Sequence, residues 1–378
     1  MKKDENKEPL RVLMLFTILN RGGAEAMVMN YYRKIDRSKV QFDFVVHREE
    51  KGDYEDEVTA LGGKIYRMMP LRPHTIGKYK RQIAKFFDEH PDYKIIHGQC
   101  SESGYFFYKE AARRGIPVIV AHAHSSHVKV DLKWFFRTWM KYKMRPYLTH
   151  YFSCGEEASE WLFGKKLAQK AIILKNAINT NKYGFYEETR TKKRKELRLQ
   201  DSDLAVCHIG TYIKVKNHSF IVDIFAELLK KKPKAKLVLI GEGELMAQTK
   251  KKVHDCGIEG QVMFLGVRRD VNELMQAADV LVFPSLFEGL PVTLVEAQCT
   301  GLPCVISDSI PNEVAFTDLV EQMSLGESAD KWAERLITAA GKKHARASYP
   351  HDVAKAGFDI KGNATWLQDF YLKAAGRQ

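Results

Sequence analysis

Short, apolar, β-rich runs that alternate with longer segments of helical periodicity constrain the fold of this chain more than any other feature. Consecutive Val, Ile, Leu and Phe residues are typical of strands buried on both faces of a parallel sheet. A glycine-containing or polar loop and a helical segment follow most of these runs, which predicts βαβ units and an α/β fold. The strand-like runs are residues 11–19, 40–47, 64–67, 93–98 and 117–122 in the first half, and 204–210, 236–240, 262–265, 280–283 and 303–307 in the second.

The length of 378 residues is sufficient for two domains, each with its own core. Hydrophobic residues make up 45% of the chain, as in ordinary soluble proteins. No run approaches the roughly 20 apolar residues of a membrane-spanning helix, and residues 1–7 are too highly charged for a secretory signal. We therefore expect a cytoplasmic protein.

The formal net charge of +13 suggests anionic partners: nucleic acid, phosphate-rich ligands or the inner leaflet of a membrane. No zinc-finger, helix-turn-helix or RNA-binding signature accompanies the charge, so we expect no nucleic-acid partner. The six cysteines form no C-x-x-C pair and are expected to be buried thiols. They stand at positions 100, 154, 207, 256, 299 and 304.

The turn that follows the run 280–283 carries two carboxylates. Glu288 stands in the loop and Glu296 on the helix predicted to begin at Pro291, and helical side chains lean back toward the N-terminus, so both can reach one ligand. The free N–H groups of the first helical turn can bind phosphate, and carboxylates accept hydrogen bonds from ribose and sugar hydroxyls. A nucleotide-sugar offers all of these partners. The alternative is a capped surface helix with two incidental acids.

The segment P-S-L-F-E-G-L-P-V-T-L-V-E-A resembles the E-x7-E motif of the retaining GT-B glycosyltransferases of family 4. The resemblance implies that Glu296 binds the donor ribose and that Glu288 contacts the transferred sugar. It also implies that Gly289, Leu290 and Pro291 line the donor site. The implied fold is GT-B: two Rossmann-like, doubly wound parallel-sheet domains that face a cleft, with a C-terminal helix that crosses back to the first domain.

The resemblance covers nearly the whole chain and implies the domain limits. Residues 171–179 resemble the crossing segment between the domains, although Lys175 and Ala177 replace the usual proline and glycine. We expect an acceptor-binding domain over residues 1–180, a donor-binding domain over 181–354, and a tail of residues 355–378 that packs on the first domain.

Further donor contacts are implied in the second domain. Lys216 matches a lysine that grips the donor diphosphate, but Thr211 stands where the family carries an arginine. A lysine holds phosphate as a point charge and lacks the bidentate fork of a guanidinium, and Lys214 is a partial substitute. The remaining implied donor residues are Gly241 and Gly243 in a G-x-G turn and Arg268 in a segment whose main chain meets the base.

The first domain carries glycines and histidines at the ends of predicted strands. Gly22 and Gly23 let the backbone approach a ligand and resemble the family's glycine loop at the cleft. His97 stands at a strand's carboxyl end, where open α/β sheets bind ligands, or it is simply a loop residue.

Three further histidines stand at or just after the end of the run 117–122: His122, His124 and His127. They could hold a metal, but no nearby acidic or cysteine ligand completes the set, so we expect none. The resemblance implies that one of them faces the reacting sugar, with His124 as the first choice and His122 as the second.

Residues 131–151 interleave aromatic rings with lysines and arginines. Such a helix suits the surface of an anionic bilayer, with Trp and Tyr at the headgroup level. The alternative is a core-packed helix with a solvated basic face.

The function implied by the resemblance is the retaining transfer of a sugar from a nucleotide-sugar, expected to be UDP-linked, to a glycan or lipid-linked saccharide in cell-surface polysaccharide synthesis. No D-x-D motif lies in a suitable loop, so Lys216 and the helix N–H groups would neutralise the leaving diphosphate without a metal or cofactor. The alternatives are a GT-B nucleotide-sugar epimerase and a non-catalytic partner subunit that keeps the fold.

Overall fold

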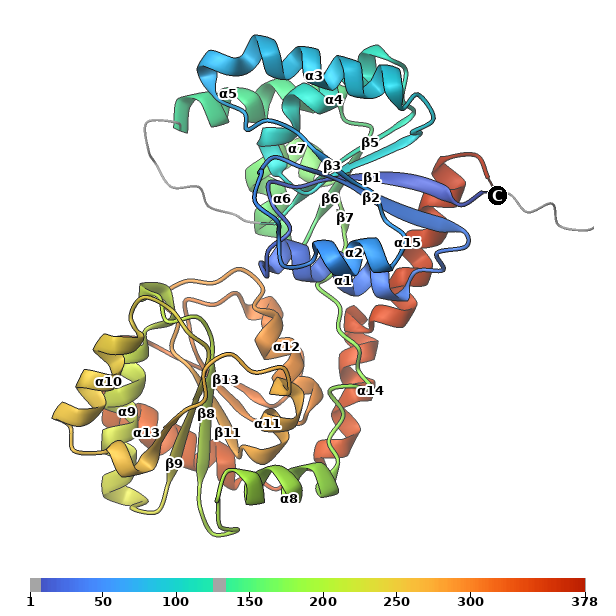
Figure 1. Cartoon of the computed structure of the whole chain (residues 1–378). Coiled ribbons are helices and arrows are strands. Elements are labelled where there is room, and N and C mark those ends of the chain that lie inside the picture. Colours follow the sequence, from blue (N-terminus) through green and yellow to red (C-terminus); the bar gives the residue numbers. More distant parts are fainter. Residues whose placement is uncertain (1–7, 125–133, 378) are drawn as a thin grey trace, which may run out of the picture. The chain divides into compact units, whose positions relative to one another are not determined.

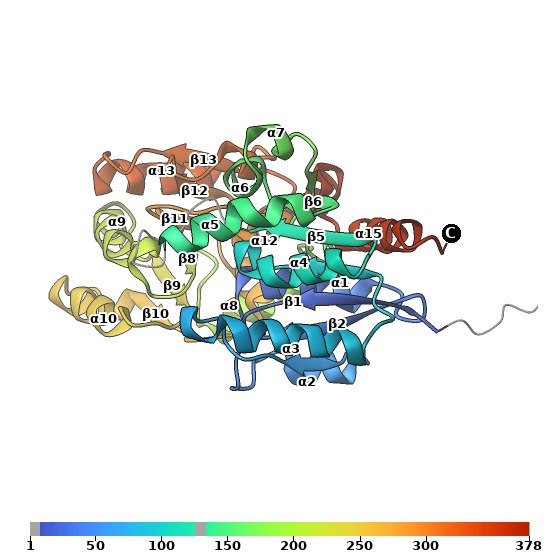
Figure 2. The same cartoon turned by 90° about the horizontal axis from the view of Figure 1, so that it is seen from above.

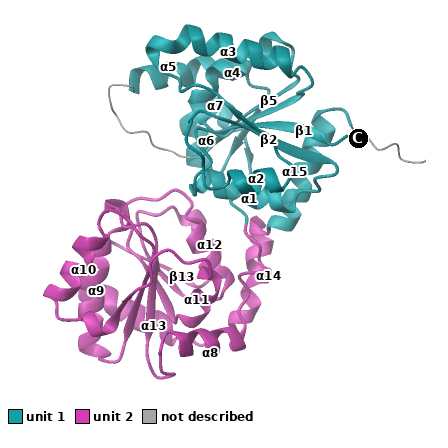
Figure 3. Cartoon of the chain, viewed as in Figure 1, with its two compact units in different colours: residues 1–177, 360–378 teal, residues 178–359 magenta. Residues whose placement is uncertain are grey.

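The computed structural model describes residues 8–124 and 134–377, and it divides the chain into two compact units (Figures 1 and 3). Unit 1 comprises residues 1–177 and 360–378, and unit 2 comprises residues 178–359. The charged opening at residues 1–7, His127 and residues 131–133 of the aromatic segment lie outside the described residues.

Unit 1 is built on a seven-stranded parallel sheet with the strand order β3-β2-β1-β4-β5-β6-β7. The strands are β1 (Leu10–Leu15), β2 (Val40–Val46), β3 (Ile65–Arg67), β4 (Ile95–Gly98), β5 (Val118–Ala123), β6 (His150–Ser153) and β7 (Ile172–Ile173). The helices are α1 (Gly23–Lys34), α2 (Glu55–Ala60), α3 (Ile76–Glu89), α4 (Tyr105–Arg113), α5 (Trp134–Met144), α6 (Glu156–Phe163), α7 (Lys165–Ala168) and α15 (Ile360–Ala374).

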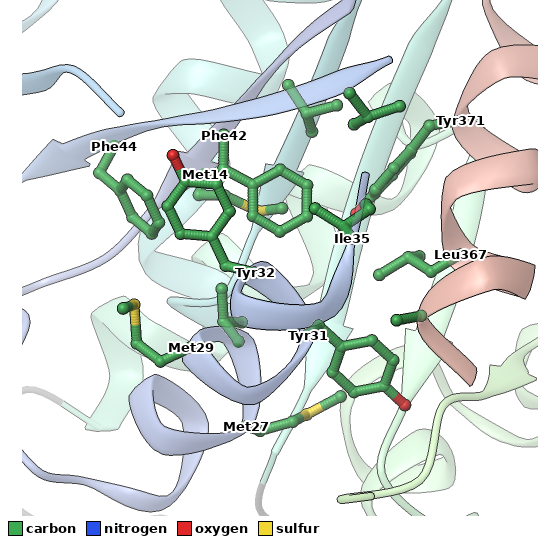
Figure 4. Packing of buried hydrophobic residues seen from close by; sticks show 14 of the residues in the cluster. Met14, Met27, Met29, Tyr31, Tyr32, Ile35, Phe42, Phe44, Leu367 and Tyr371 are labelled. Carbon is green, nitrogen blue, oxygen red and sulfur yellow. The ribbon is translucent and has the colours of Figure 1, made fainter. Parts of the chain in front are cut away.

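Helices cover both faces of this sheet, which explains why most residues of its strands are apolar. In β1, Val12 packs in the core beneath α1 and α15, whereas its neighbour Leu13 packs in the core beneath α3, α4 and α6. The second view shows α3, α4 and α5 side by side over the sheet (Figure 2). On the other face, Tyr371 of α15 meets Phe42 edge-to-face at 6.0 Å (Figure 4). The predicted return of the C-terminal helix to the first domain is therefore confirmed.

Unit 2 is built on a six-stranded parallel sheet with the order β10-β9-β8-β11-β12-β13. The strands are β8 (Ala205–Ile209), β9 (Lys236–Ile240), β10 (Val262–Phe264), β11 (Val280–Phe283), β12 (Cys304–Ser307) and β13 (Val320–Met323). The helices are α8 (Glu187–Glu196), α9 (His218–Lys231), α10 (Met246–Asp255), α11 (Val271–Ala277), α12 (Val292–Cys299), α13 (Ala329–Gly341) and α14 (Tyr349–Val353). Cores of α9 and α13 on one face and of α11 and α12 on the other confirm the predicted α/β class with two doubly wound parallel-sheet domains.

The observed limits differ from the expected ones by a few residues. Ile178 forms a bridge to Asp359, and Thr180 Oγ1 donates to Asp359 Oδ1 at 3.0 Å, and residues 178–180 and 355–359 accordingly belong to unit 2. The edge strand β13 was not predicted, because only β12 pairs with it and its sequence V-E-Q-M is half exposed. Cys256 is exposed, so the expectation of buried thiols was wrong at that position.

The part of the chain that the structure describes contains no helix that is both long and apolar enough to span a bilayer.

Candidate functional site

The turn between β11 and α12 carries the two predicted carboxylates. All residues of β11 are apolar and buried, and the strand ends at Phe283. Glu288 lies in the loop, and Pro291 adopts an extended backbone at the N-cap of α12, one position before the helix. Glu296 lies on α12 and is partly buried. The strand, turn and helix thus occur in the predicted order.

An ion pair joins the loop after β11 to the loop after β8. Lys216 Nζ lies 2.6 Å from Glu288 Oε1, and the two side chains are only 16% and 15% exposed. Nζ also lies 4.6 Å from the centroid of the Phe283 ring, a cation–π distance. The backbone N–H of Leu286 donates to Val215 O at 2.8 Å and holds the two loops together. The residues predicted for phosphate and sugar binding therefore meet at the carboxyl edge of adjacent strands.

Glu296 is held by a residue that the sequence analysis did not select. Tyr183 Oη donates a hydrogen bond of 2.5 Å to Glu296 Oε1. Burial raises the pKa of Glu296 to about 7, while this hydrogen bond and the charge of Lys182 oppose the rise. Desolvation disfavours the charged carboxylate, whereas a donated hydrogen bond favours it. One oxygen of Glu296 is thus held by the protein, and the carboxyl group titrates near neutral pH.

The side chains expected to replace the family arginine are solvent-exposed. Thr211 and Lys214 are both exposed in the loop after β8. Lys214 lines an open groove of about 770 Å³ between the start of α9 and α10, and the described lining of this groove includes neither Glu288 nor Glu296. Lys216, rather than Lys214, is the cation beside the predicted sugar-binding carboxylate.

Close packing of two loops explains the predicted G-x-G turn. Gly241 has a φ of +132°, and a β-carbon there would lie 2.1 Å from Gly210 O. A β-carbon at Gly243 would lie 2.7 Å from the backbone N of Tyr212. Both glycines therefore let the loop after β9 press against the loop after β8. Gly289, by contrast, is exposed, and a β-carbon there would meet no atom within 4 Å.

The Arg268 guanidinium is hydrogen-bonded to neighbouring carboxylates. Its Nε and Nη2 donate to Asp270 at 2.8 and 2.7 Å, and Nη2 also donates to Glu196 at 2.9 Å. These hydrogen bonds raise the pKa of Arg268. The guanidinium is thus part of a surface ion-pair network.

Unit 1 brings the predicted histidines together at the carboxyl ends of β4 and β5. His97 Nε2 lies 3.2 Å from His122 Nδ1, and the His122 ring stacks on the His124 ring with centroids 4.2 Å apart. His124 Nε2 lies 2.6 Å from Oε1 of Gln99, and His97 Nδ1 lies 2.6 Å from the hydroxyl of Tyr371. Burial lowers the pKa of His97 to about 3 and that of His124 to about 4, so both rings are neutral at neutral pH.

The glycine pair lies at the N-terminus of α1. Gly22 is the N-cap and Gly23 is the first helical residue. A β-carbon at Gly23 would meet no atom within 4 Å, so packing does not require glycine there. This open backbone is compatible with the predicted approach of a ligand.

Similarity to known proteins identifies the family of this chain. Residues 189–354 match the family model described as glycosyl transferases group 1, and residues 21–182 match the model of glycosyltransferase family 4. EpsF of Bacillus subtilis (strain 168), a protein named as a glycosyltransferase, is 33% identical over 373 residues, which span 97% of each chain. The chain belongs to glycosyltransferase family 4.

Two further proteins resemble this family-4 glycosyltransferase. The UDP-Gal:alpha-D-GlcNAc-diphosphoundecaprenol alpha-1,3-galactosyltransferase of Escherichia coli is 26% identical over 225 residues, which cover 57% of this chain and 58% of that protein. The structure of Anabaena HepE in complex with UDP has a TM-score of 0.79 at 16% identity and covers 96% of this chain and 100% of that one. The structural likeness confirms the GT-B fold.

Within the described residues, the family-4 protein has no group of three or more His, Cys, Asp or Glu side chains placed to hold a metal ion. The histidines at the ends of β4 and β5 are instead bonded to one another, to Gln99 and to Tyr371.

Sequence reasoning missed Gln99, Tyr183 and Tyr371. Each contacts its partner from a segment distant along the chain, so no local pattern marks it. Only the position of Gln99, directly after the strand that carries His97, was a signal that could have identified one of them.

Proposed function

We propose that this protein is a retaining, metal-independent glycosyltransferase that moves a sugar from a UDP-sugar to a saccharide or lipid-linked acceptor in cell-surface polysaccharide synthesis. The observation that carries this proposal is the Lys216–Glu288 pair beside the start of α12. HepE is the subject of structures with UDP and with UDP-glucose, and the name of the Escherichia coli relative specifies a UDP-linked donor and a diphosphoundecaprenol acceptor. These relatives support the choice of donor and acceptor class.

The chemistry follows from the charges at the edge of the second sheet. The bond between the anomeric carbon and the diphosphate oxygen breaks, and the negative charge that grows on the diphosphate needs a cation and N–H donors. Lys216 supplies the cation, and backbone N–H groups at the start of α12, which has no side-chain cap, supply the donors. The acceptor oxygen bonds to the anomeric carbon on the face that the diphosphate leaves, and its proton passes to a diphosphate oxygen.

The carboxylates have distinct roles in this proposal. Glu288 hydrogen-bonds the transferred sugar once the diphosphate competes for Lys216. Glu296 accepts hydrogen bonds from the ribose through the oxygen that Tyr183 does not hold. A carboxylate with one oxygen already fixed is restrained in orientation, which favours specific recognition of a diol.

Calorimetry of UDP binding without added metal tests the donor class. We expect micromolar binding that Lys216→Ala and Glu296→Ala each weaken by about 1.5–3 kcal/mol, the scale of hydrogen bonds to charged groups. Lys251→Ala, which removes an exposed lysine of the same unit, is the matched control and should leave binding unchanged. Absence of binding to UDP, GDP and ADP would favour the non-catalytic partner subunit.

The reaction itself is tested with UDP-sugars and saccharide acceptors, with the anomeric configuration of the product read by NMR. We expect UDP release that depends on acceptor, is insensitive to EDTA, and gives the anomer of the donor. Conversion of the donor sugar into its epimer without any acceptor would instead establish the epimerase alternative.

We further propose that α5 rests on an anionic bilayer surface. Phe135, Trp139 and Tyr142 follow one face of this helix and are 78%, 43% and 57% exposed, whereas Met140 and Met144 are buried on the opposite side. Lys143 is exposed next to this face, and the Arg145 guanidinium lies 4.5 Å from the Tyr142 ring. Exposed rings flanked by cations match the headgroup region of an anionic membrane.

Sedimentation with lipid vesicles tests the membrane proposal. We expect binding to vesicles that contain phosphatidylglycerol and much weaker binding to pure phosphatidylcholine, and Phe135→Ser with Trp139→Ser should reduce it. Trp366→Ser removes a ring of similar exposure, 45%, from α15 and serves as the control. Equal binding by both variants and the wild type would contradict the proposal.

A further inference from the structure

His124 is restrained at one edge and on one face. Its Nε2 lies 2.6 Å from Gln99 Oε1, and Gln99 is only 6% exposed in the loop after β4. The His122 ring lies nearly parallel to that of His124, with an interplanar angle of 19°. These two contacts determine where the ring lies and how it is rotated.

The support of His124 extends to the C-terminal helix. His122 Nδ1 lies 3.2 Å from His97 Nε2, and His97 Nδ1 lies 2.6 Å from the Tyr371 hydroxyl. His97, His122 and Tyr371 are all at most 1% exposed, so water does not compete for these bonds. The stacking surface beneath His124 is therefore itself fixed by buried hydrogen bonds.

The surroundings of Gln99 determine which end of its amide faces His124. Gln99 Nε2 lies 3.8 Å from Met14 Sδ. A thioether accepts hydrogen bonds but has none to donate, so the NH2 group belongs on that side and the carbonyl oxygen faces His124. The oxygen can only accept, and consequently the proton of the neutral ring lies on Nε2 of His124.

The other nitrogen of His124 is thereby left as an acceptor. Among the described residues, none is placed to hydrogen-bond His124 Nδ1. Burial also keeps the ring uncharged, because it lowers the pKa of His124 to about 4. A hydroxyl group can donate to such a nitrogen, whereas a carboxylate or phosphate oxygen cannot.

We propose that Gln99 is a positioning residue that holds His124 with its proton on Nε2, so that Nδ1 accepts a hydrogen bond from a hydroxyl of a saccharide bound at unit 1. The sugar in this statement rests on the proposed function, whereas the position of the proton belongs to the protein alone. Gln99 acts through His124 and does not itself contact the sugar.

NMR of the full chain labelled with 15N in its histidine rings reads the tautomer directly, with the His124 signal assigned through His124→Gln. We expect the Nε2–H pattern for His124. His47 provides an internal reference for the opposite form, because its Nδ1 lies 2.7 Å from the carbonyl oxygen of Phe16 and must donate to it. An Nδ1–H pattern for His124 in the wild type would overturn the proposal.

Gln99→Leu removes the acceptor with little change in size. We expect the His124 signal to move away from the Nε2–H pattern while His47 stays unchanged. We also expect kcat/KM for transfer to fall about 10-fold or more, with UDP affinity within about twofold of the wild type. An unchanged His124 tautomer in this variant contradicts the proposal.

Gln99→Glu keeps an acceptor oxygen and covers the case in which the leucine variant does not fold. We expect it to retain the proton on Nε2, and a move of that proton to Nδ1 would overturn the proposal. Failure of the wild type to bind UDP would contradict the proposed function instead, and the tautomer measurement would still decide the role of Gln99.

Discussion

Lys216 and Glu288 neutralise each other in a partly buried pair, and under the proposed function each exchanges its partner when a nucleotide-sugar binds. In that proposal the diphosphate takes the positive charge of Lys216, and the Glu288 carboxylate becomes free to accept hydrogen bonds from sugar hydroxyls. The pair therefore keeps both groups in place before binding. The pair also lowers the affinity for the donor, because the diphosphate has to replace the Coulombic attraction between Lys216 and Glu288.

Glu288→Gln separates these two effects. The amide keeps the size of the side chain but no longer competes for Lys216, so we expect UDP affinity to stay within about threefold of the wild type or to rise. The transfer rate should fall about 100-fold or more, because an interaction with the reacting sugar is lost. Calorimetry and initial rates measure the two, and Glu244→Gln, at an exposed carboxylate, is the control. A transfer rate within about threefold of the wild type would rule out this role for Glu288.

Tyr183 and Glu296 predict a pH dependence of UDP binding. The pKa of Glu296 is raised to about 7, so its ionised fraction, the better acceptor for ribose hydroxyls, grows as the pH rises through that value. We expect UDP affinity to increase over the same range. Tyr183→Phe removes a hydrogen bond that favours the ionised form, and it should move the midpoint to higher pH.

Calorimetry between about pH 6 and pH 8.5 measures UDP affinity on both sides of the raised pKa of Glu296 and gives the midpoint of its change. Glu296→Gln cannot titrate, and its profile gives the contribution of the ligand and of all other groups. A profile of the wild type that matches that of Glu296→Gln would show that Glu296 is not in contact with the nucleotide.

At the scale of elements, the loops after β8, β9 and β11 pack against one another at the carboxyl edge of the second sheet. Glycine at position 241 permits the close contact of the loop after β9 with Gly210. The hydrogen bond from the Leu286 N–H to Val215 O joins the loop after β11 to the loop after β8. These three loops together determine the position of Lys216 before any ligand is bound.

Gly241→Ala and Gly289→Ala form a matched pair of substitutions. The first places a methyl group 2.1 Å from a backbone oxygen at a φ of +132°, and the second places it in open space. We expect Gly241→Ala to destabilise unit 2 by about 1–3 kcal/mol and Gly289→Ala to change stability by less than about 0.5 kcal/mol. Thermal and urea unfolding monitored by circular dichroism measure both. Equal stability of the two variants would contradict the packing role of the G-x-G turn.

At the scale of the whole molecule, the chain order and the units do not coincide. Unit 2 is one continuous segment, residues 178–359, whereas unit 1 needs residues 360–378 from the other end of the chain. Helix α15 contributes Leu367 and Tyr371 to the core beneath α1. Removal of α15 would expose that core and break the hydrogen bond that supports His97.

We therefore expect residues 178–359 expressed alone to fold cooperatively, with a dispersed NMR spectrum. Residues 1–177 alone should aggregate or remain partly unfolded, because one face of their sheet lacks its covering helix. Addition of residues 360–378 through a flexible linker should restore folding. A stable, monomeric fragment of residues 1–177 would contradict the structural role of α15.

The sequence by itself determined the βαβ order, the central strands of both parallel sheets and the region around Glu288, Glu296 and Lys216. These features depend on local periodicity and on residues close together along the chain. The tertiary structure alone decided the bond from Tyr183 to Glu296, the network of Arg268, and the chain from Tyr371 through His97 to His122. Each of these joins side chains from segments far apart in the sequence, and it is the packing of helices on the sheets that brings their polar atoms within hydrogen-bond distance.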